Sequence, residues 1–143
     1  MKSLKGLFAL TFFALYMPIA LAQSPVGDWT TVDDKTGKKR AVVRLVLNDK
    51  ILTGTIIDVY PEAGDTGTCA KCPEPFKEQP IKGLQFLWGL KDRGDGVWEG
   101  GQVLEAKTGQ IYRARLRVKG NKLYVRGYVG MVILGRTQVW IRA

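Results

Sequence analysis

Apolar and polar side chains alternate along most of this chain with a period of two. Between residues 110 and 118, for example, arginines separate Tyr112, Ala114, Leu116 and Val118. Such alternation is typical of β-strands, in which successive side chains point to opposite faces. Runs rich in Gly, Asn and Asp separate the alternating segments and are typical of tight turns. The pattern predicts strands at residues 29–32, 40–47, 51–60, 84–87, 102–105, 110–118, 122–129 and 137–142.

Short strands with glycine-rich turns and no helical period indicate an all-β fold, either a sandwich or a barrel. Turns are expected at residues 92–96 and 100–101, among others. Trp29 lies on the first predicted strand, and Trp140 and Arg142 lie on the last. We interpret this pairing as barrel closure, with the Arg142 guanidinium stacked on the Trp29 ring in a structural role.

The segment from 61 to 80 differs from the rest of the chain because it holds four prolines. Proline lacks the N–H group that a central strand needs, so we expect one long loop here. Loops of this length often act as lids or binding elements. An ordered cover over a barrel mouth is an equally good interpretation.

Cys69 and Cys72 lie within this long loop. We favour a disulfide that clips the loop, because an exported protein is oxidised. A redox-active dithiol is the alternative, although the βαβ context of thioredoxin-like motifs is missing. A zinc site fits less well, since two thiolates fill only half of a tetrahedral site.

The segment from 110 to 129 predicts a hairpin with a two-residue turn at Gly120-Asn121. In this register one face is apolar, with Val118 opposite Leu123 and Tyr112 opposite Val129. The other face is basic and aromatic. It pairs Arg117 with Tyr124, Arg115 with Arg126 and Arg113 with Tyr128.

Two arginines directly opposite each other destabilise a sheet, so an anion is expected beside Arg115 and Arg126. A carboxylate from a neighbouring strand, Glu99 or Glu105, is one candidate. A bound phosphate or carboxylate is the other, because guanidinium groups bind such anions with paired hydrogen bonds. On the second interpretation the ligand-binding residues are Arg113, Arg115, Tyr124, Arg126 and Tyr128.

The first 22 residues have the order of a secretory signal. Lys2 and Lys5 precede an apolar run at residues 7–20, and Ala20-Leu21-Ala22 provides small residues at a cleavage site. The apolar run of about fourteen residues is shorter than the roughly twenty that a membrane-spanning helix needs. We therefore expect a signal peptide at 1–22, one barrel domain at 23–143, and a periplasmic or secreted protein.

The formal net charge of the whole chain is +9, and removal of Lys2 and Lys5 leaves +7. A basic exported protein is attracted to acidic partners over a range set by ionic strength. The expected partners are an anionic small molecule, a lipid or a glycan of the cell envelope, and not nucleic acid. The sequence leaves the oligomeric state open.

No catalytic signature is assembled, and the chain contains no histidine. Ser-His and Cys-His nucleophile pairs are therefore excluded, as is proton transfer by an imidazole group. Asp58, Glu62 and Asp65 could form a glycosidase-like carboxylate pair, although acidic loop residues are usually solvated. We expect a non-enzyme without catalytic residues, a cofactor or a metal.

Several motifs together resemble a bacterial family of exported small proteins of unknown function. They are Gly27-x-Trp29, the stretch 65–72, Gln79-Pro80-Ile81-x-Gly83-Leu84, Gly101, Thr108-Gly109-x-x-Tyr112, Leu123-x-Val125-Arg126-Gly127-Tyr128-Val129-Gly130 and Gly135-Arg136-Thr137-Gln138-x-Trp140. The resemblance implies a single antiparallel, lipocalin-like closed barrel of about eight strands, located in the periplasm or outside the cell. It implies no activity.

These observations favour a binding module for an anionic or amphiphilic small molecule or for an envelope component. One alternative is a thiol-redox or envelope-stress protein that uses Cys69 and Cys72. Another is a carrier of a hydrophobic ligand, which requires an open lumen on the order of several hundred Å³. Neither the ligand nor the open end of the barrel follows from the sequence.

Overall fold

The computed structural model describes residue 6 and residues 13–16, 23–131 and 135–143. Most of the predicted signal peptide, residues 1–22, lies outside these residues, and the signal peptide remains a prediction. No helix within the described residues is long and apolar enough to cross a membrane.

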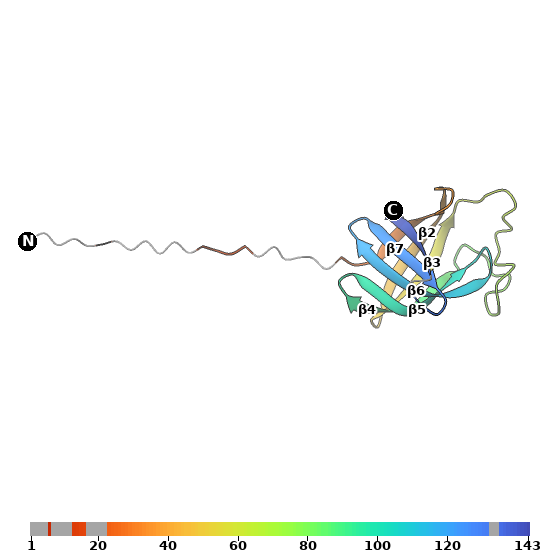
Figure 1. Ribbon diagram of the computed structural model, residues 1–143. Coiled ribbons are helices and arrows are strands. Elements are labelled where there is room, and N and C mark those ends of the chain that lie inside the picture. Colours follow the sequence, from red (N-terminus) through yellow and green to blue (C-terminus); the bar gives the residue numbers. More distant parts are fainter. Residues whose placement is uncertain (1–5, 7–12, 17–22, 132–134) are drawn as a thin grey trace, which may run out of the picture.

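Eight strands form one closed antiparallel barrel in which each strand pairs with its sequence neighbours and β1 pairs with β8 (Figure 1). The strands are β1 (Gly27–Val32), β2 (Lys39–Asn48), β3 (Ile51–Val59), β4 (Gln85–Gly94), β5 (Val97–Glu105), β6 (Gln110–Lys119), β7 (Lys122–Tyr128) and β8 (Arg136–Arg142). The predicted all-β closed barrel is confirmed.

The predicted end of β4, at residue 87, and the predicted start of β5, at residue 102, are wrong. The turn between them is narrower than expected, because Asp95 and Gly96 both adopt positive φ angles, of 55° and 75°. Gly100-Gly101 is not a turn but an irregularity inside β5, where the register shifts between Glu99 and Gly101. A Cβ atom at Gly101 would lie 2.2 Å from the Trp88 carbonyl oxygen, so glycine permits a close approach of β4 and β5 here.

The β6–β7 hairpin has the predicted register. Leu116 lies opposite Val125, Arg115 opposite Arg126, and Lys119 opposite Lys122 across the two-residue turn. The inward residues Ala114, Leu116 and Val118 of β6 and Leu123 and Val125 of β7 are buried. The expectation that Val129 continues this apolar face is wrong, because β7 ends at Tyr128 and the Val129 side chain is 71% exposed.

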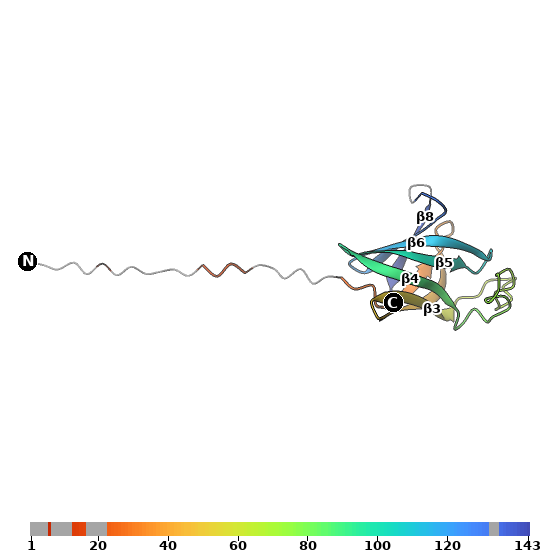
Figure 2. The same ribbon diagram turned by 90° about the horizontal axis from the view of Figure 1, so that it is seen from below.

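The two ends of the barrel differ. One end carries the turns at 49–50, 95–96 and 120–121 and is filled by buried leucines. Packing there is tight: a Cβ atom at Gly54 would lie 2.8 Å from Leu45 Cδ2. The opposite end carries the longer connections, including the loop from 60 to 84 (Figures 1 and 2).

The long loop between β3 and β4 is held by its own hydrogen bonds and by the barrel. Cys69 N–H donates to the Gln79 carbonyl over 2.8 Å, and Ile81 N–H donates to Gly67 over 3.0 Å. Phe76 stacks on Trp88 of β4 with ring centroids 5.5 Å apart. These contacts give the loop a defined position beside the barrel end.

Candidate ligand-binding site

A cavity of about 450 Å³ occupies the loop end of the barrel lumen. Its wall consists mainly of inward apolar side chains that the two-residue alternation of the strands directs into the barrel. The principal apolar residues are Ala41 and Val43 of β2, Ile56 and Val59 of β3, Phe86 of β4, Val103 and Leu104 of β5, Val125 of β7 and Trp140 of β8, with Ile81 from the long loop. The volume lies in the ordinary range of small-molecule sites.

Arg40 lies at the rim of this cavity and connects the barrel to the long loop. Its Nη1 atom lies 3.0 Å from Glu62 Oε2, and its Nη2 atom lies 3.4 Å from Asp65 Oδ2. A backbone hydrogen bond from Glu62 and the Arg40 charge both hold the pKa of the Asp65 carboxyl below its usual value. Two of the three carboxylates considered for catalysis therefore form ion pairs with Arg40.

Arg136 lies on the other side of the rim, at the start of β8. Its guanidinium donates to both carboxylate oxygens of Asp34, in the β1–β2 connection. These hydrogen bonds lower the pKa of Asp34 from its ordinary value of 3.8. The pair joins the first and last parts of the barrel at the open end, as bidentate Arg–carboxylate geometry allows.

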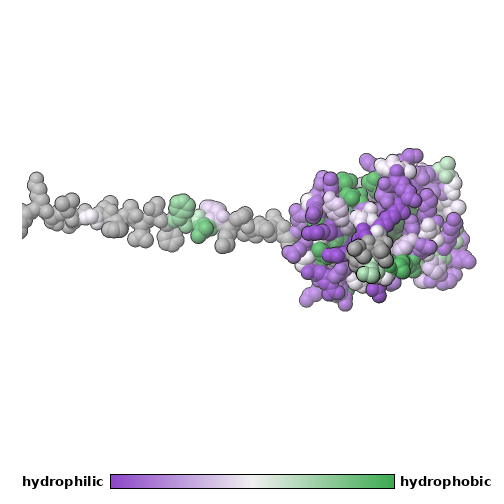
Figure 3. All heavy atoms as spheres, viewed as in Figure 1, coloured by the Kyte–Doolittle hydropathy of each residue, from purple (hydrophilic) through white to green (hydrophobic). Residues whose placement is uncertain are grey.

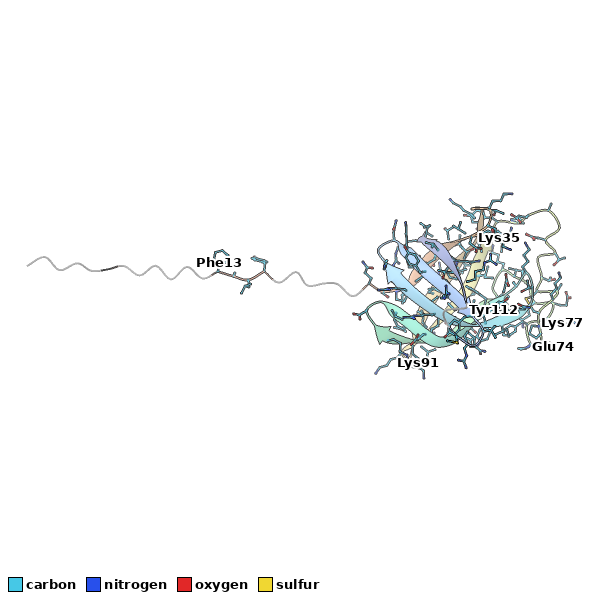
Figure 4. All side chains as sticks on the ribbon, in the orientation of Figure 1. Phe13, Lys35, Glu74, Lys77, Lys91 and Tyr112 are labelled. Carbon is cyan, nitrogen blue, oxygen red and sulfur yellow. A yellow bond between two sulfur atoms is a disulfide. The ribbon has the colours of Figure 1, made fainter. Side chains whose placement is uncertain are left out.

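Glu105 and Tyr112 form a third polar group at the cavity. The Tyr112 hydroxyl lies 3.5 Å from Glu105 Oε2 and also contacts the Gln110 side chain, and Thr108 Oγ1 donates to Glu105 over 2.9 Å. Figure 4 shows Tyr112 on β6, near the loop end. Burial raises the pKa of the Tyr112 phenol, and the Glu105 charge raises it further. The phenol therefore stays neutral and can donate a hydrogen bond.

Of the three residues assigned to barrel closure, Trp29 and Arg142 are paired at the seam between β1 and β8, whereas Trp140 lines the cavity. Trp29 is completely buried, and its ring centroid lies 4.2 Å from Arg142 Cζ. The same guanidinium donates to the carbonyls of Ser24 and Val26 over 3.0 and 3.2 Å. Trp140 is 3% exposed, contributes to the cavity wall and donates its indole N–H to Gln138 over 3.2 Å.

On the outer face, the carboxylate beside the opposed arginines is Glu99. Its Oε2 atom lies 3.7 Å from Arg115 Nε, and its Oε1 atom lies 3.6 Å from Arg93 Nε. Arg126 donates to Thr137 Oγ1 over 2.6 Å. The opposed pair Arg115 and Arg126 thus has a carboxylate from β5 beside it, which is the first of the two candidates for the expected anion.

Arg113 and Arg117 lie exposed on this face, and Tyr124 is half-buried. The expectation that Tyr128 forms part of an exposed aromatic surface is wrong, because Tyr128 is only 9% exposed. Gly135 lies against it: a Cβ atom there would come 2.7 Å from Tyr128 Cβ. Gly135, directly before β8, therefore lies over Tyr128, which no strand pattern could indicate.

Cys69 and Cys72 are joined by a disulfide, with Cα atoms 5.3 Å apart. Both residues are buried, at 0% and 4% exposure. Their segment packs against the β5–β6 turn, where Gly109 leaves room for the Lys71 carbonyl. A second hollow, of about 800 Å³, lies between the long loop and the rim near Arg40.

The polar rim was missed by the sequence analysis. Arg40, Glu105, Tyr112 and Arg136 come from four strands and meet only because the barrel closes. One rim residue could have been found from the sequence, because the alternation of β6 places Tyr112 on the inward face. Among the described residues, no group of three or more His, Cys, Asp and Glu side chains could hold a metal ion.

A closed antiparallel barrel of eight strands, with an apolar cavity at one end, defines the lipocalin-like class of small barrels. The chain belongs to a family described as "Uncharacterized protein conserved in bacteria (DUF2147)", whose model matches residues 27–142. A solved structure with the same fold is titled "Protein HP1028 from the human pathogen Helicobacter pylori belongs to the lipocalin family". It has 21% sequence identity and a TM-score of 0.71, and the match covers 82% of each chain. No curated protein matches the chain significantly.

Proposed function

We propose that this barrel binds one small amphiphilic molecule, with the apolar part in the lumen and the polar head group at the rim. The observation that carries the proposal is the cavity of about 450 Å³ lined mainly by apolar side chains. Burial of a ligand's apolar surface against Val43, Ile56 and Val125 supplies the favourable free energy, at roughly 25 cal/mol per Å².

The rim favours a polar head group. The charged residues that line the cavity are Arg40, Lys107 and Arg136, which are cationic, and Asp33 and Glu105, which are acidic. Arg40 is already ion-paired with Glu62 and Asp65, and Arg136 with Asp34. The neutral Tyr112 phenol can donate to a head-group oxygen in place of its present acceptors, the Gln110 and Glu105 side chains. An amphiphile with a polar head group therefore fits this cavity better than a purely apolar molecule of the same length.

A fluorescence titration with a dansyl-labelled undecanoic acid tests this function. The wild-type protein should raise and blue-shift the dansyl emission. The double variant Ile56→Phe/Val125→Phe fills the lumen and should abolish the change. Its matched control, Val46→Phe/Val139→Phe, introduces two phenylalanines at half-buried positions outside the cavity wall and should bind like the wild type. Equal binding by the filled and control variants would exclude a lumen site.

The proposal includes export, because the first 22 residues have the order of a secretory signal. N-terminal sequencing of the protein from the native cell envelope should give Gln23 as the first residue. An intact Met1 or Lys2 start on the functional protein would contradict export by cleavage.

Burial of both cysteines favours a structural disulfide over a redox-active pair. A reactive thiol needs an accessible, electropositive position, whereas Cys69 and Cys72 belong to the hydrophobic core cluster. The disulfide then shapes the loop that contributes Ile81 to the cavity wall.

A further inference from the structure

One side of the barrel carries a regular array of cationic side chains, which we call the basic ladder. Its members lie on the outer face of the β6–β7 hairpin, because the intervening residues on both strands are buried. They are Arg113, Arg115, Arg117 and Lys119 of β6 and Lys122 and Arg126 of β7.

The positive charge of the protein is concentrated around this ladder. Residues 97–128 contain seven Lys and Arg residues but only two acidic residues, Glu99 and Glu105. Glu105 lies at the cavity rim, and Glu99 is shared between Arg93 and Arg115. Figure 3, in the orientation that places β6 and β7 in front in Figure 1, shows a mainly hydrophilic surface. The excess charge on this face is therefore available to an acidic partner.

The ladder is an extended array rather than a pocket. Side chains on one face of a strand recur about every 7 Å, and neighbouring strands lie about 5 Å apart. Arg113 and Lys119 are six residues apart along β6, so the ladder is roughly 20 Å long. Its spacing suits many anionic groups in one plane better than a single small anion.

Two exposed apolar residues lie at the end of this array nearest the cavity. Val129 is 71% exposed and Met131 is 66% exposed, and they follow directly after β7. Val129 also contributes to the cavity rim. Exposed apolar side chains gain nothing from a hydrated polyanion such as a glycan, but they can insert among acyl chains below a layer of head groups.

We propose that the basic ladder, together with Val129 and Met131, docks this barrel on a lipid bilayer rich in anionic head groups. The arginines and lysines contact the head groups while the two apolar side chains enter the bilayer interface. This orientation places the cavity rim next to the membrane surface. The inference goes beyond the lumen function and does not depend on it.

Co-sedimentation with vesicles tests the docking surface. The wild-type protein should bind vesicles of phosphatidylglycerol and phosphatidylcholine, and not vesicles of phosphatidylcholine alone, and added salt should release it. The triple variant Arg113→Gln/Arg117→Gln/Lys119→Gln should bind roughly a hundredfold more weakly, given the contribution of each cation near an anionic surface. Val129→Ser/Met131→Ser should bind roughly tenfold more weakly through loss of apolar burial.

The matched control removes the same charge elsewhere. Lys50, Lys71 and Lys77 are exposed, and Figure 4 shows Lys77 on the long loop. Their replacement by glutamine should weaken vesicle binding far less than the ladder variant does. Circular dichroism and thermal unfolding of each variant confirm that the barrel is intact.

Three results would overturn the proposal. The first is absence of binding to anionic vesicles. The second is an equal loss of vesicle affinity in the ladder and control variants. The third is unchanged vesicle binding by Val129→Ser/Met131→Ser together with tight binding of heparin. The last result would assign the ladder to soluble polyanions. The lumen-filling variant Ile56→Phe/Val125→Phe should still bind vesicles, so failure of the lumen function and failure of docking are distinguishable.

Discussion

The guanidinium of Arg142, on the last strand, lies over the ring of Trp29, on the first, at 4.2 Å from its centroid. This contact joins the two ends of the sheet at the seam of the barrel. The seam is short, since only Trp29–Arg142 and Thr30–Ile141 are paired between β1 and β8. Beside these pairs, Ala143 N–H donates to the Asp28 carbonyl over 3.0 Å, and the Trp29–Arg142 side-chain contact adds to closure.

Replacement of Arg142 should destabilise the barrel. Arg142→Lys keeps the charge but loses the planar stacking and the paired donation to Ser24 and Val26. We expect a loss of about 1 to 2 kcal/mol in the free energy of unfolding. Denaturant unfolding measures it, with the exposed Arg117→Lys as control. Equal stability of both variants would show that the stacked geometry does not hold the seam.

Arg136 and Asp34 should contribute a pH-dependent part of the stability. The folded-state pKa of Asp34 lies below its ordinary value of 3.8. The contribution is therefore fully present above the ordinary value and disappears as the pH falls through the folded-state pKa. The pair is partly exposed, so its contribution is at most about 1 kcal/mol.

Unfolding of Arg136→Gln and wild-type protein, followed between neutral pH and about pH 2, tests this dependence. The difference in the free energy of unfolding between the two proteins should be constant near neutral pH and should vanish in acid. Arg113→Gln, which removes an exposed charge from β6, controls for the change in net charge. A difference that persists unchanged at the acid end would contradict the assignment to Asp34.

Gly101 should tolerate no side chain. A Cβ atom there would lie 2.2 Å from the Trp88 carbonyl oxygen and 2.7 Å from the Leu90 nitrogen, both backbone atoms. Gly101→Ala should therefore lower the free energy of unfolding by about 3 kcal/mol or more, because β4 and β5 must separate. Gly127→Ala is the control, since its nearest neighbour is a side-chain atom at 3.4 Å. Similar midpoints in urea for the two variants would be inconsistent with a close β4–β5 approach.

Removal of the disulfide should affect ligand binding more than folding. The ring closed by Cys69 and Cys72 is short, so loop entropy gives it about 2 kcal/mol at most. The double variant Cys69→Ser/Cys72→Ser should still form the barrel, as judged by far-UV circular dichroism. It should bind the dansyl fatty acid more weakly, because the loop that carries Ile81 loses its shape. Wild-type affinity of the variant for the dansyl fatty acid would show that the disulfide does not shape the ligand site.

The strand pattern was predictable because burial imposes alternation on each strand separately. The β6–β7 register could be predicted from the position of one turn. The contact between Trp29 and Arg142 could be predicted from the pairing of the first and last strands in a closed barrel. The turn predicted at Gly100-Gly101 was wrong. A glycine pair is typical of both turns and bulges, and only the neighbouring strand decides between them.

The cavity rim could not be predicted in the same way. Arg40, Glu105 and Arg136 have ordinary positions at strand ends and acquire a common role only from the three-dimensional closure of the barrel. The outer arginines were conspicuous in sequence because they lie on one hairpin. Because this pattern is local, it suggested a ligand-binding surface on the outer face. The cavity in the lumen is now the better candidate for the ligand site.

Quenching of tryptophan fluorescence by a brominated fatty acid tests the lumen site most directly. Of the four tryptophans, Trp140 belongs to the cavity wall, whereas Trp88 stacks on Phe76 outside it. Binding should quench the wild-type protein and Trp88→Phe strongly, and Trp140→Phe should lose most of the quenching. Undiminished quenching in Trp140→Phe would place the acyl chain outside the barrel and contradict the account.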